Sequence, residues 1–236
     1  MAQIKANEAL VKALQTWNID HLYGIPGDSV DAVVDSLRTV RDQFKFYHVR
    51  HEEVASLAAA SYTKMTGKIG VALSIGGPGI VHLLNGMYDA KMDNVPQLII
   101  AGQTNSTLLG TKFFQETNIS KMVDDVAVYH HQIQKGDNVF EITNEAIRTA
   151  YEKKGVSVII CPNDLLTQKI KDTTNRAVDT TKPKPASPKF KSIKKAAKLI
   201  DKAKKPVMLI GLGTQHAKDE LREFIEAAII PRSEEH

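Results

Sequence analysis

The sequence contains a single cysteine, Cys161, among 236 residues. One cysteine excludes an internal disulfide and a zinc site of several cysteines, so we expect a reducing compartment and a buried core role for Cys161. Long apolar runs are lacking as well, because stretches such as VPQLIIAG are far too short to span a bilayer. The N-terminus, MAQIKANEALVKAL, lacks the apolar region of a signal peptide and predicts an amphipathic helix.

Basic character is confined to one segment of the chain. The net charge is +4, yet residues 1–164 are about three negative and residues 165–205 about ten positive. This basic segment has no interleaved aromatic residues and no nucleic-acid recognition motif. We therefore expect a solvated linker and helix face there, and no nucleic-acid partner.

Uninterrupted apolar runs alternate with segments of helical period through the first part of the chain. Such alternation predicts an α/β fold, a doubly wound parallel sheet with helices on both faces. Strands are expected near residues 21–25, 44–50, 69–75, 97–101, 126–129 and 156–161, and helices near 7–17, 30–37, 54–62, 83–88 and 139–153. We place this domain at residues 1–175.

The remaining residues predict a linker followed by an incomplete second α/β unit. Residues 176–190 hold Pro183, Pro185 and Pro188 among Thr, Ser and Lys residues, which is typical of an extended linker. Residues 191–236 predict two helices around one strand, too little to bury a core. The terminal PRSEEH lacks the apolar strand expected after Ala228, so we expect the last few residues to be foreign or displaced.

Three polar residues, His51, Glu52 and Glu53, follow a predicted strand and open an alanine-rich helix. Ligands of open parallel sheets bind at this end of the strands. Acidic residues are also common in the first turn of ordinary helices, so this stretch alone leaves a functional and a purely structural interpretation open. The alanines leave little side-chain bulk, and we expect this helix to pack closely on a neighbour.

Five motifs of the first domain stand out, GIPGDS (24–29), VRHEEVASLAAA (49–60), GGPG followed by HLLNG (76–86), DNVP (93–96) and FQET (114–117). Together they resemble the N-terminal, pyrimidine-binding domain of thiamine-diphosphate-dependent 2-oxoacid enzymes. The resemblance is strongest to pyruvate oxidases and covers residues 1 to about 175. The rest of the chain resembles the start of the family's central, flavin-binding domain.

The resemblance implies roles for three residues in catalysis. Glu52 matches the glutamate that hydrogen-bonds the pyrimidine ring and promotes its imino tautomer, and we expect an apolar surround to raise its pKa. Phe114 and Gln115 match a pair that borders the reacting carbon, where the amide would bind substrate oxygen and the ring would exclude water. Glu53 points about 100° away around the helix and keeps the structural interpretation.

The resemblance also implies a set of cofactor-binding residues. The thiamine set is Gly24, Ile25, Pro26, Gly27, Glu52, Pro78, Gly79 and His82, and the flavin set is Gly211 and Gly213. For His82 a role as a satisfied core histidine remains open. The GGPG loop lacks the following Gly-Lys-Ser/Thr of a Walker phosphate site. The adjacent His130 and His131 should face opposite sides of a strand, so we assign no metal ligands.

The implied function is oxidative decarboxylation of pyruvate to acetate or acetyl phosphate and CO2, with thiamine diphosphate, Mg2+ and FAD as cofactors and a quinone or oxygen as acceptor. The family binds magnesium through a Gly-Asp-Gly motif that this sequence lacks, so we expect half a site, an inactive fragment, and metal ligands outside this chain. The parent would be a cytoplasmic homodimer or homotetramer, with peripheral membrane contact through missing parts as an option. Alternatives are an acetolactate synthase or decarboxylase fragment, or a non-catalytic assembly module.

Overall fold

The computed structural model describes residues 2–183, 187–214 and 217–234, so residues 184–186 of the predicted linker and the last two residues lie outside the described part. The chain divides into two compact units, Met1–Pro183 and Lys184–His236.

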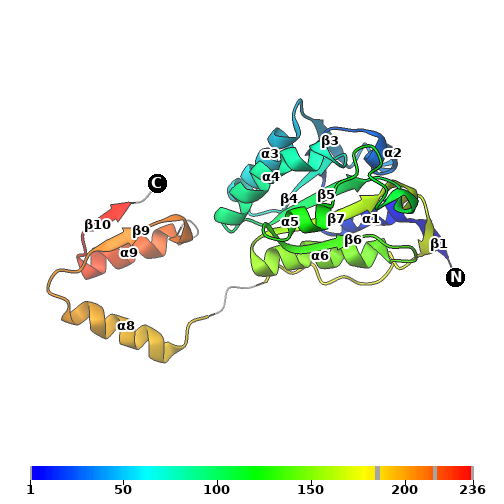
Figure 1. Ribbon diagram of the computed structural model, residues 1–236. Coiled ribbons are helices and arrows are strands. Elements are labelled where there is room, and N and C mark those ends of the chain that lie inside the picture. The colour runs from blue at the N-terminus through cyan, green and yellow to red at the C-terminus, as the bar shows by residue number, and fades with distance from the viewer. Residues whose placement is uncertain (1, 184–186, 215–216, 235–236) are drawn as a thin grey trace. The chain divides into compact units, whose positions relative to one another are not determined.

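The first unit is built on a six-stranded sheet in which all neighbouring strands are parallel, in the order β3-β2-β4-β5-β7-β6 (Figure 1). The strands are β2 (His21–Gly24), β3 (Lys45–His48), β4 (Gly70–Ser74), β5 (Gln97–Gln103), β6 (Ala127–Gln132) and β7 (Val156–Pro162). Every residue of β4, β5 and β7 is buried. These are the continuous apolar runs of the sequence, and their burial on both faces confirms the predicted doubly wound α/β fold.

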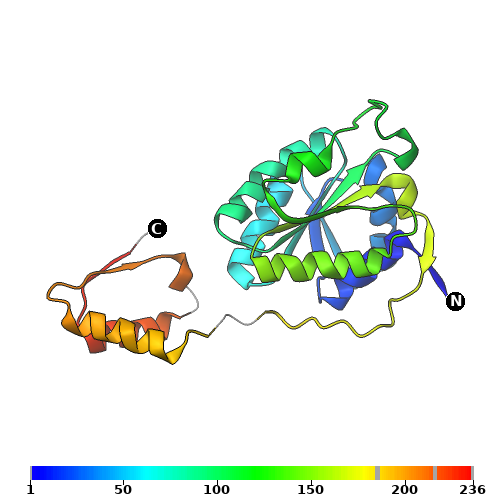
Figure 2. The same cartoon turned by 60° about the horizontal axis from the view of Figure 1, so that its bottom comes forward.

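Helices cover both faces of this sheet, as Figures 1 and 2 show. One face packs on α1 (Ala6–Thr16), α2 (Asp31–Thr39), α6 (Val139–Lys153) and α7 (Asn163–Leu166). The other face packs on α3 (Glu52–Thr66), α4 (Pro78–Met92) and α5 (Ile119–Val123). Short 3-10 turns at Asp28–Val30 and Ser106–Leu108 follow β2 and β5. The hydrophobic core therefore consists of two layers separated by the sheet.

Helices α3 and α4 approach each other closely. Ala55 and Ala59 of α3 are fully buried. A Cβ atom placed on Gly86 of α4 would lie 2.5 Å from the backbone nitrogen of Leu57 and 2.6 Å from the carbonyl carbon of Ser56. The alanine-rich helix thus packs tightly on a neighbour, as its composition predicts, and this contact fixes the positions of the side chains that both helices carry.

Four short elements were not predicted from the sequence. β1 (Gln3–Lys5) pairs antiparallel with β8 (Lys169–Lys171), and α5 and α7 are one-turn helices. Each of the two strands buries only its central isoleucine. A single buried residue gives no detectable period, which is why these elements escape sequence reasoning.

The segment 176–183 follows the surface of the first unit in extended conformation. Arg176 forms an ion pair with Glu141 at 2.6 Å, and the Arg148 guanidinium donates to the Asp179 carbonyl at 2.8 Å. The Lys182 ammonium donates to the Gly67 carbonyl. This part of the predicted linker is therefore held against the domain that precedes it.

The second unit contains α8 (Phe190–Lys202), β9 (Met208–Ile210), a 3-10 turn (Leu212–Thr214), α9 (Lys218–Ala228) and β10 (Arg232–Glu234). β10 pairs parallel with β9. The expectation that no strand follows Ala228 is wrong, because parallel pairing uses backbone groups that any side chain leaves available. Helix α8 buries none of its residues, so this unit has little core. No helix in the described part of either unit is long and apolar enough to cross a membrane.

Candidate functional site

The loops after β2 and β4 meet at the C-terminal edge of the sheet. A Cβ atom on Gly27 would lie 2.6 Å from Cγ2 of Ile75, and one on Gly79 would lie 2.9 Å from Cγ1 of the same side chain. The Gly76 amide donates to the Ser29 hydroxyl at 3.1 Å. The GIPGDS and GGPG motifs, whose bonded residues are 47 positions apart in the sequence, therefore form one surface, and small residues are required where they touch.

Other residues assigned to this surface differ in exposure. Gly24 is the buried last residue of β2 and faces the backbone of Leu73 in the neighbouring strand. Ile25 is half-buried, whereas Pro26 is exposed. Pro78 is exposed and occupies the first turn of α4, where a missing N–H costs nothing. The structure thus places these predicted residues along one edge, with Gly24 as part of the sheet.

Glu52 lies in the first turn of α3, directly after the loop that leaves β3. Its side chain is 13% exposed, and its Oε2 is 3.0 Å from Nδ1 of His82, which α4 carries. The His51 ring stacks on the His82 ring, with centroids 4.4 Å apart and planes at 29°. The carboxylate therefore sits at the sheet edge beside two imidazoles.

The expected rise in the pKa of Glu52 is wrong. Burial does act to raise its pKa, but the hydrogen bond with His82, a backbone hydrogen bond and the charges of His82 and His51 outweigh burial and lower it. The apolar surround was expected from the resemblance. The structure instead places the imidazoles of His51 and His82 beside the carboxylate, and they favour its charged form.

Glu53 makes a separate set of contacts. Its carboxylate accepts from the Asn85 amide of α4, and its backbone N–H donates to Nδ1 of His51 at 3.3 Å. His51 thereby caps the N-terminus of α3. Neighbouring carboxylates of one helix turn thus have different partners, Glu52 with His82 and Glu53 with Asn85.

Phe114 and Gln115 border a cavity of about 170 Å³ at the same edge of the sheet. Asp28, Ser29, Gly76 and Gln103 also line it. Phe114 is 77% exposed, and Gln115 has a left-handed backbone with φ of 61°. A Cβ atom on Gly77 would lie 2.9 Å from the Gln115 carbonyl oxygen, so this loop rests directly on the GGPG loop.

The loop that carries these two residues is organised by Glu116, which the sequence analysis did not single out. Its Oε1 accepts from the Gly110 amide at 2.5 Å and its Oε2 from the Phe113 amide at 3.1 Å. These backbone hydrogen bonds, that of Gly110 first, lower the pKa of Glu116. The Glu116 carboxylate thus stabilises the conformation of this loop through hydrogen bonds with its backbone. The only sequence signal was its place in the FQET motif.

Gly211 and Gly213 belong to the second unit. They follow β9, and a Cβ atom on either would meet open space within 4 Å. Their exposure leaves backbone free to approach a ligand, but among the described residues no side chain lies within 4 Å of a Cβ atom on either glycine to mark the pair as a site.

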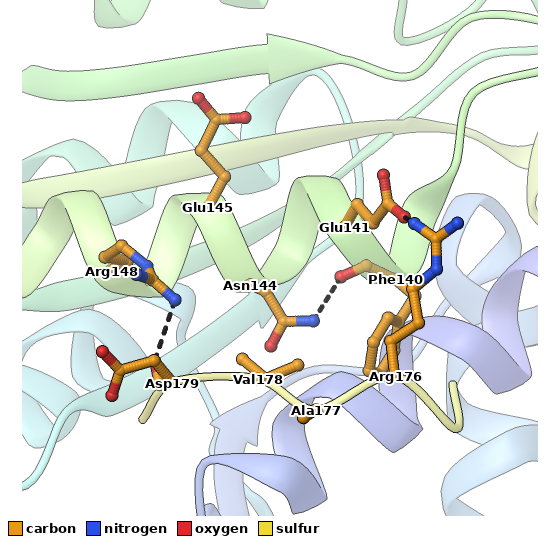
Figure 3. Close-up of a pocket in the computed structure, with 9 residues that line it drawn as sticks. All are labelled: Phe140, Glu141, Asn144, Glu145, Arg148, Arg176, Ala177, Val178 and Asp179. Atoms are coloured by element: carbon orange, nitrogen blue, oxygen red, sulfur yellow. Dashed lines mark hydrogen bonds and ion pairs between the residues drawn. The ribbon is translucent and has the colours of Figure 1, made fainter. Parts of the chain in front are cut away.

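A larger cavity, of about 330 Å³, lies between α6 and residues 176–179 (Figure 3). Phe140, Ala177 and Val178 supply its apolar lining. Figure 3 shows Arg148 directed at the Asp179 backbone and Arg176 at Glu141, while Glu145 points away. These charged groups hold the segment against the helix, so the cavity is a product of that packing.

Comparison with known proteins relates both units to one family. The family model "Thiamine pyrophosphate enzyme, N-terminal TPP binding domain" matches residues 4–122 of the sequence. The family model "Thiamine pyrophosphate enzyme, central domain" matches residues 193–235. The second match includes all but the last of the residues that we expected to be foreign or displaced, so the expectation that they are foreign is wrong.

Three full-length relatives align with almost the whole chain. This chain is 46% identical, over 98% of its own length, to the Bacillus subtilis protein named "Putative thiamine pyrophosphate-containing protein YdaP". It is 38% identical over 97% to pyruvate oxidase of Lactiplantibacillus plantarum, and 33% identical over 97% to acetolactate synthase of Mycobacterium leprae. The chain spans 40%, 38% and 37% of these relatives, respectively.

Proposed function

Because the chain belongs to the thiamine pyrophosphate enzyme family, we propose that it supplies the pyrimidine-binding half of the active site of a pyruvate oxidase. The observation that carries this proposal is the shielded Glu52 carboxylate at the C-terminal edge of a doubly wound sheet, beside the glycine loops. The 38% identity to a pyruvate oxidase supports the choice of reaction.

The residues at this edge fit a flat, nitrogen-containing ring. Gly27 and Gly79 carry no side chain, and Ile75 fills the space that a Cβ atom on either would need, so their backbone can lie close to a ligand at this edge. Glu52 offers a charged carboxylate held by His82, and a carboxylate at this position can share a proton with a ring nitrogen. When bound, thiamine diphosphate supplies a carbon nucleophile and an electron sink for decarboxylation of a 2-oxoacid.

Phe114 and Gln115 would act on the substrate side of this site. Their loop lies against Gly77 and borders the cavity that Ser29 and Gly76 also line. A Gln115 amide in this place can donate to a carboxylate or carbonyl oxygen of pyruvate, and the exposed Phe114 ring can exclude water once a neighbouring surface covers it.

The proposed reaction converts pyruvate, an electron acceptor and water or phosphate to CO2, reduced acceptor and acetate or acetyl phosphate. FAD would carry the electrons, with Gly211 and Gly213 near the nucleotide, and Mg2+ would bind the diphosphate through residues that are not in this sequence. We propose that the parent protein is a homo-oligomer, since the pyrimidine-binding half of the site in one subunit would need the diphosphate-binding half from another subunit.

A chimaera tests this proposal. The chain replaces the matched segment of YdaP, and thiamine diphosphate, Mg2+, FAD and pyruvate are added. Pyruvate-dependent reduction of ferricyanide that disappears in Glu52→Gln and persists in Glu53→Gln supports the oxidase. Acetolactate formation without ferricyanide reduction favours the acetolactate synthase alternative. Equal activity of wild type and Glu52→Gln contradicts the proposed site. The 236-residue chain alone should show no turnover.

A further inference from the structure

We propose that His51, Glu52 and His82 form a binding site for a late first-row divalent metal ion, with Zn2+ as its representative. One ligand atom from each of the three residues lies within 4.8 Å of the other two. Two imidazoles and one carboxylate are the donors that Zn2+ uses in three-ligand sites with an open fourth position. The sequence alone did not predict a metal site, because His82 is 30 residues away from the other two ligands.

The three ligands are largely preorganised. His82 is already bonded to Glu52 at 3.0 Å, and the His51 and His82 rings are stacked with centroids 4.4 Å apart. The close contact of α3 with α4 at Gly86 fixes the backbones that carry Glu52 and His82. An ion would therefore replace the proton between these two groups, with little loss of side-chain entropy.

Only His51 needs to move. Two ligands of one Zn2+ ion can be at most about 4.2 Å apart, since each bond is about 2.1 Å long. A spread of up to 4.8 Å therefore requires a small rotation of one side chain. The His51 side chain is 48% exposed, so an ion can enter from solvent. Rotation of its ring gives up the stacking on His82 and the 3.3 Å hydrogen bond from the Glu53 backbone N–H.

Glu53 completes the surroundings of the site. Its Oε2 is 3.7 Å from Nδ1 of His51, and Asn85 holds its carboxylate from α4. Metal-bound imidazoles commonly donate their second N–H to a carboxylate, which raises their basicity. Binding of the ion through Nε2 of His51 requires Nδ1 to give up the hydrogen bond that it accepts from the Glu53 backbone N–H and to carry a proton directed at the Glu53 carboxylate instead. Two carboxylates beside one cation also favour its binding electrostatically.

His130 and His131, two consecutive residues of β6, provide a control for the proposed site. His130 pairs with Asp124 at 2.8 Å and His131 with Asp137 at 2.7 Å. Each has one carboxylate partner of its own, and neither belongs to a three-residue cluster among the described residues. The double variant His130→Gln/His131→Gln therefore removes two imidazoles without touching the proposed site.

One consequence of this site rests on the proposed function. Glu52 cannot hold a metal ion and share a proton with a pyrimidine ring at the same time. Zn2+ and thiamine should then exclude each other. The metal site itself depends only on the three side chains, so it can be tested without any cofactor.

The test is a competition titration of the full 236-residue chain, free of any histidine tag, against a chromophoric zinc chelator. We expect one tight Zn2+ site per chain. Glu52→Gln, His82→Asn and His51→Asn should each weaken it at least about 100-fold, since loss of even an indirect partner costs roughly 10- to 100-fold. Glu53→Gln should weaken it about 10-fold. The His130→Gln/His131→Gln control should keep wild-type affinity.

Ring nitrogen NMR spectra of the histidines identify the ligands directly. Perturbation of His51 and His82 on addition of Zn2+, with His130 and His131 unchanged, supports the site. Unchanged affinity in Glu52→Gln or His82→Asn, or loss of the tight site in the His130→Gln/His131→Gln control, overturns it. Zn2+ binding that thiamine does not weaken leaves the metal site standing and counts against the proposed function, so the two failures are distinguishable.

Discussion

Substitution of Gly86 by alanine tests the contact that holds the site together. The added Cβ would lie 2.5 Å from the Leu57 nitrogen and 2.6 Å from the Ser56 carbonyl carbon. Non-bonded heavy atoms prefer about 3.5 Å or more, so α3 and α4 would have to separate by about 1 Å. Overpacking of this kind costs about 1–3 kcal/mol, and alanine regains about 1 kcal/mol of helix propensity. Because the added Cβ would meet backbone atoms, which cannot move aside as a flexible side chain can, we expect the free energy of unfolding to fall by about 1–2 kcal/mol.

Urea denaturation followed by tryptophan fluorescence measures this loss. Trp17 is the only tryptophan of the chain and is buried in the core of the first unit, so its signal reports that unit. Gly67→Ala is the matched control, because an added Cβ there meets open space at a φ of 67°. It should lose about 1 kcal/mol through backbone strain alone.

The two glycine variants should differ at the site. Separation of α3 and α4 by Gly86→Ala should weaken the bond between Glu52 and His82 and shift the His82 ring resonances in NMR spectra, whereas Gly67→Ala should leave them unchanged. A Gly86→Ala variant as stable as wild type, with unaltered His82 resonances, would refute the claim that this close approach positions Glu52.

Three other predictions follow from single side chains. Glu116→Gln should lower the amide hydrogen-exchange protection of the loop that carries Phe114, and equal protection in the variant contradicts this role. Because folding lowers the pKa of Glu116, its charged carboxylate orders the loop at neutral pH, and the exchange protection should be lost as pH falls through the lowered pKa. Cys161, whose pKa burial raises to about 12, should react with a thiol reagent at about pH 8 only after denaturation, and rapid reaction of the folded chain would disprove its burial. Asn144→Ala should destabilise the first unit by about 1–3 kcal/mol in urea, because it leaves the Trp17 indole N–H without its 2.8 Å acceptor; an unchanged midpoint would show that this bond adds nothing.

The sheet was predictable because its strands carry the strongest signal a sequence can give. The apolar run 69–75 became β4, and the run 97–101 became β5, which extends two residues further. The amphipathic period of 139–153 gave α6 with the same bounds. Short elements such as β1 and α5 carry one or two buried residues each, and their structure depends on contacts with distant parts of the chain.

The position of Glu52 at the edge of the sheet was predictable, but its electrostatics were not. The position of Glu52 between a strand and a helix follows from local pattern, and the glycine motifs follow from the resemblance. The lowered pKa of Glu52 depends on His82, which reaches the Glu52 carboxylate only because α3 and α4 pack side by side. The catalytic and cofactor-binding roles of Glu52, Phe114 and Gln115 stay predictions.

A titration with thiamine, followed by backbone amide NMR spectra, tests the central claim most directly. Thiamine without its diphosphate avoids non-specific attraction to the many lysines. We expect shifts that cluster at Gly24, Ile25, Gly27, Glu52 and Gly79, that vanish in Glu52→Gln and that persist in Glu53→Gln. Shifts of equal size in Glu52→Gln, or shifts confined to residues away from this edge of the sheet, would contradict it.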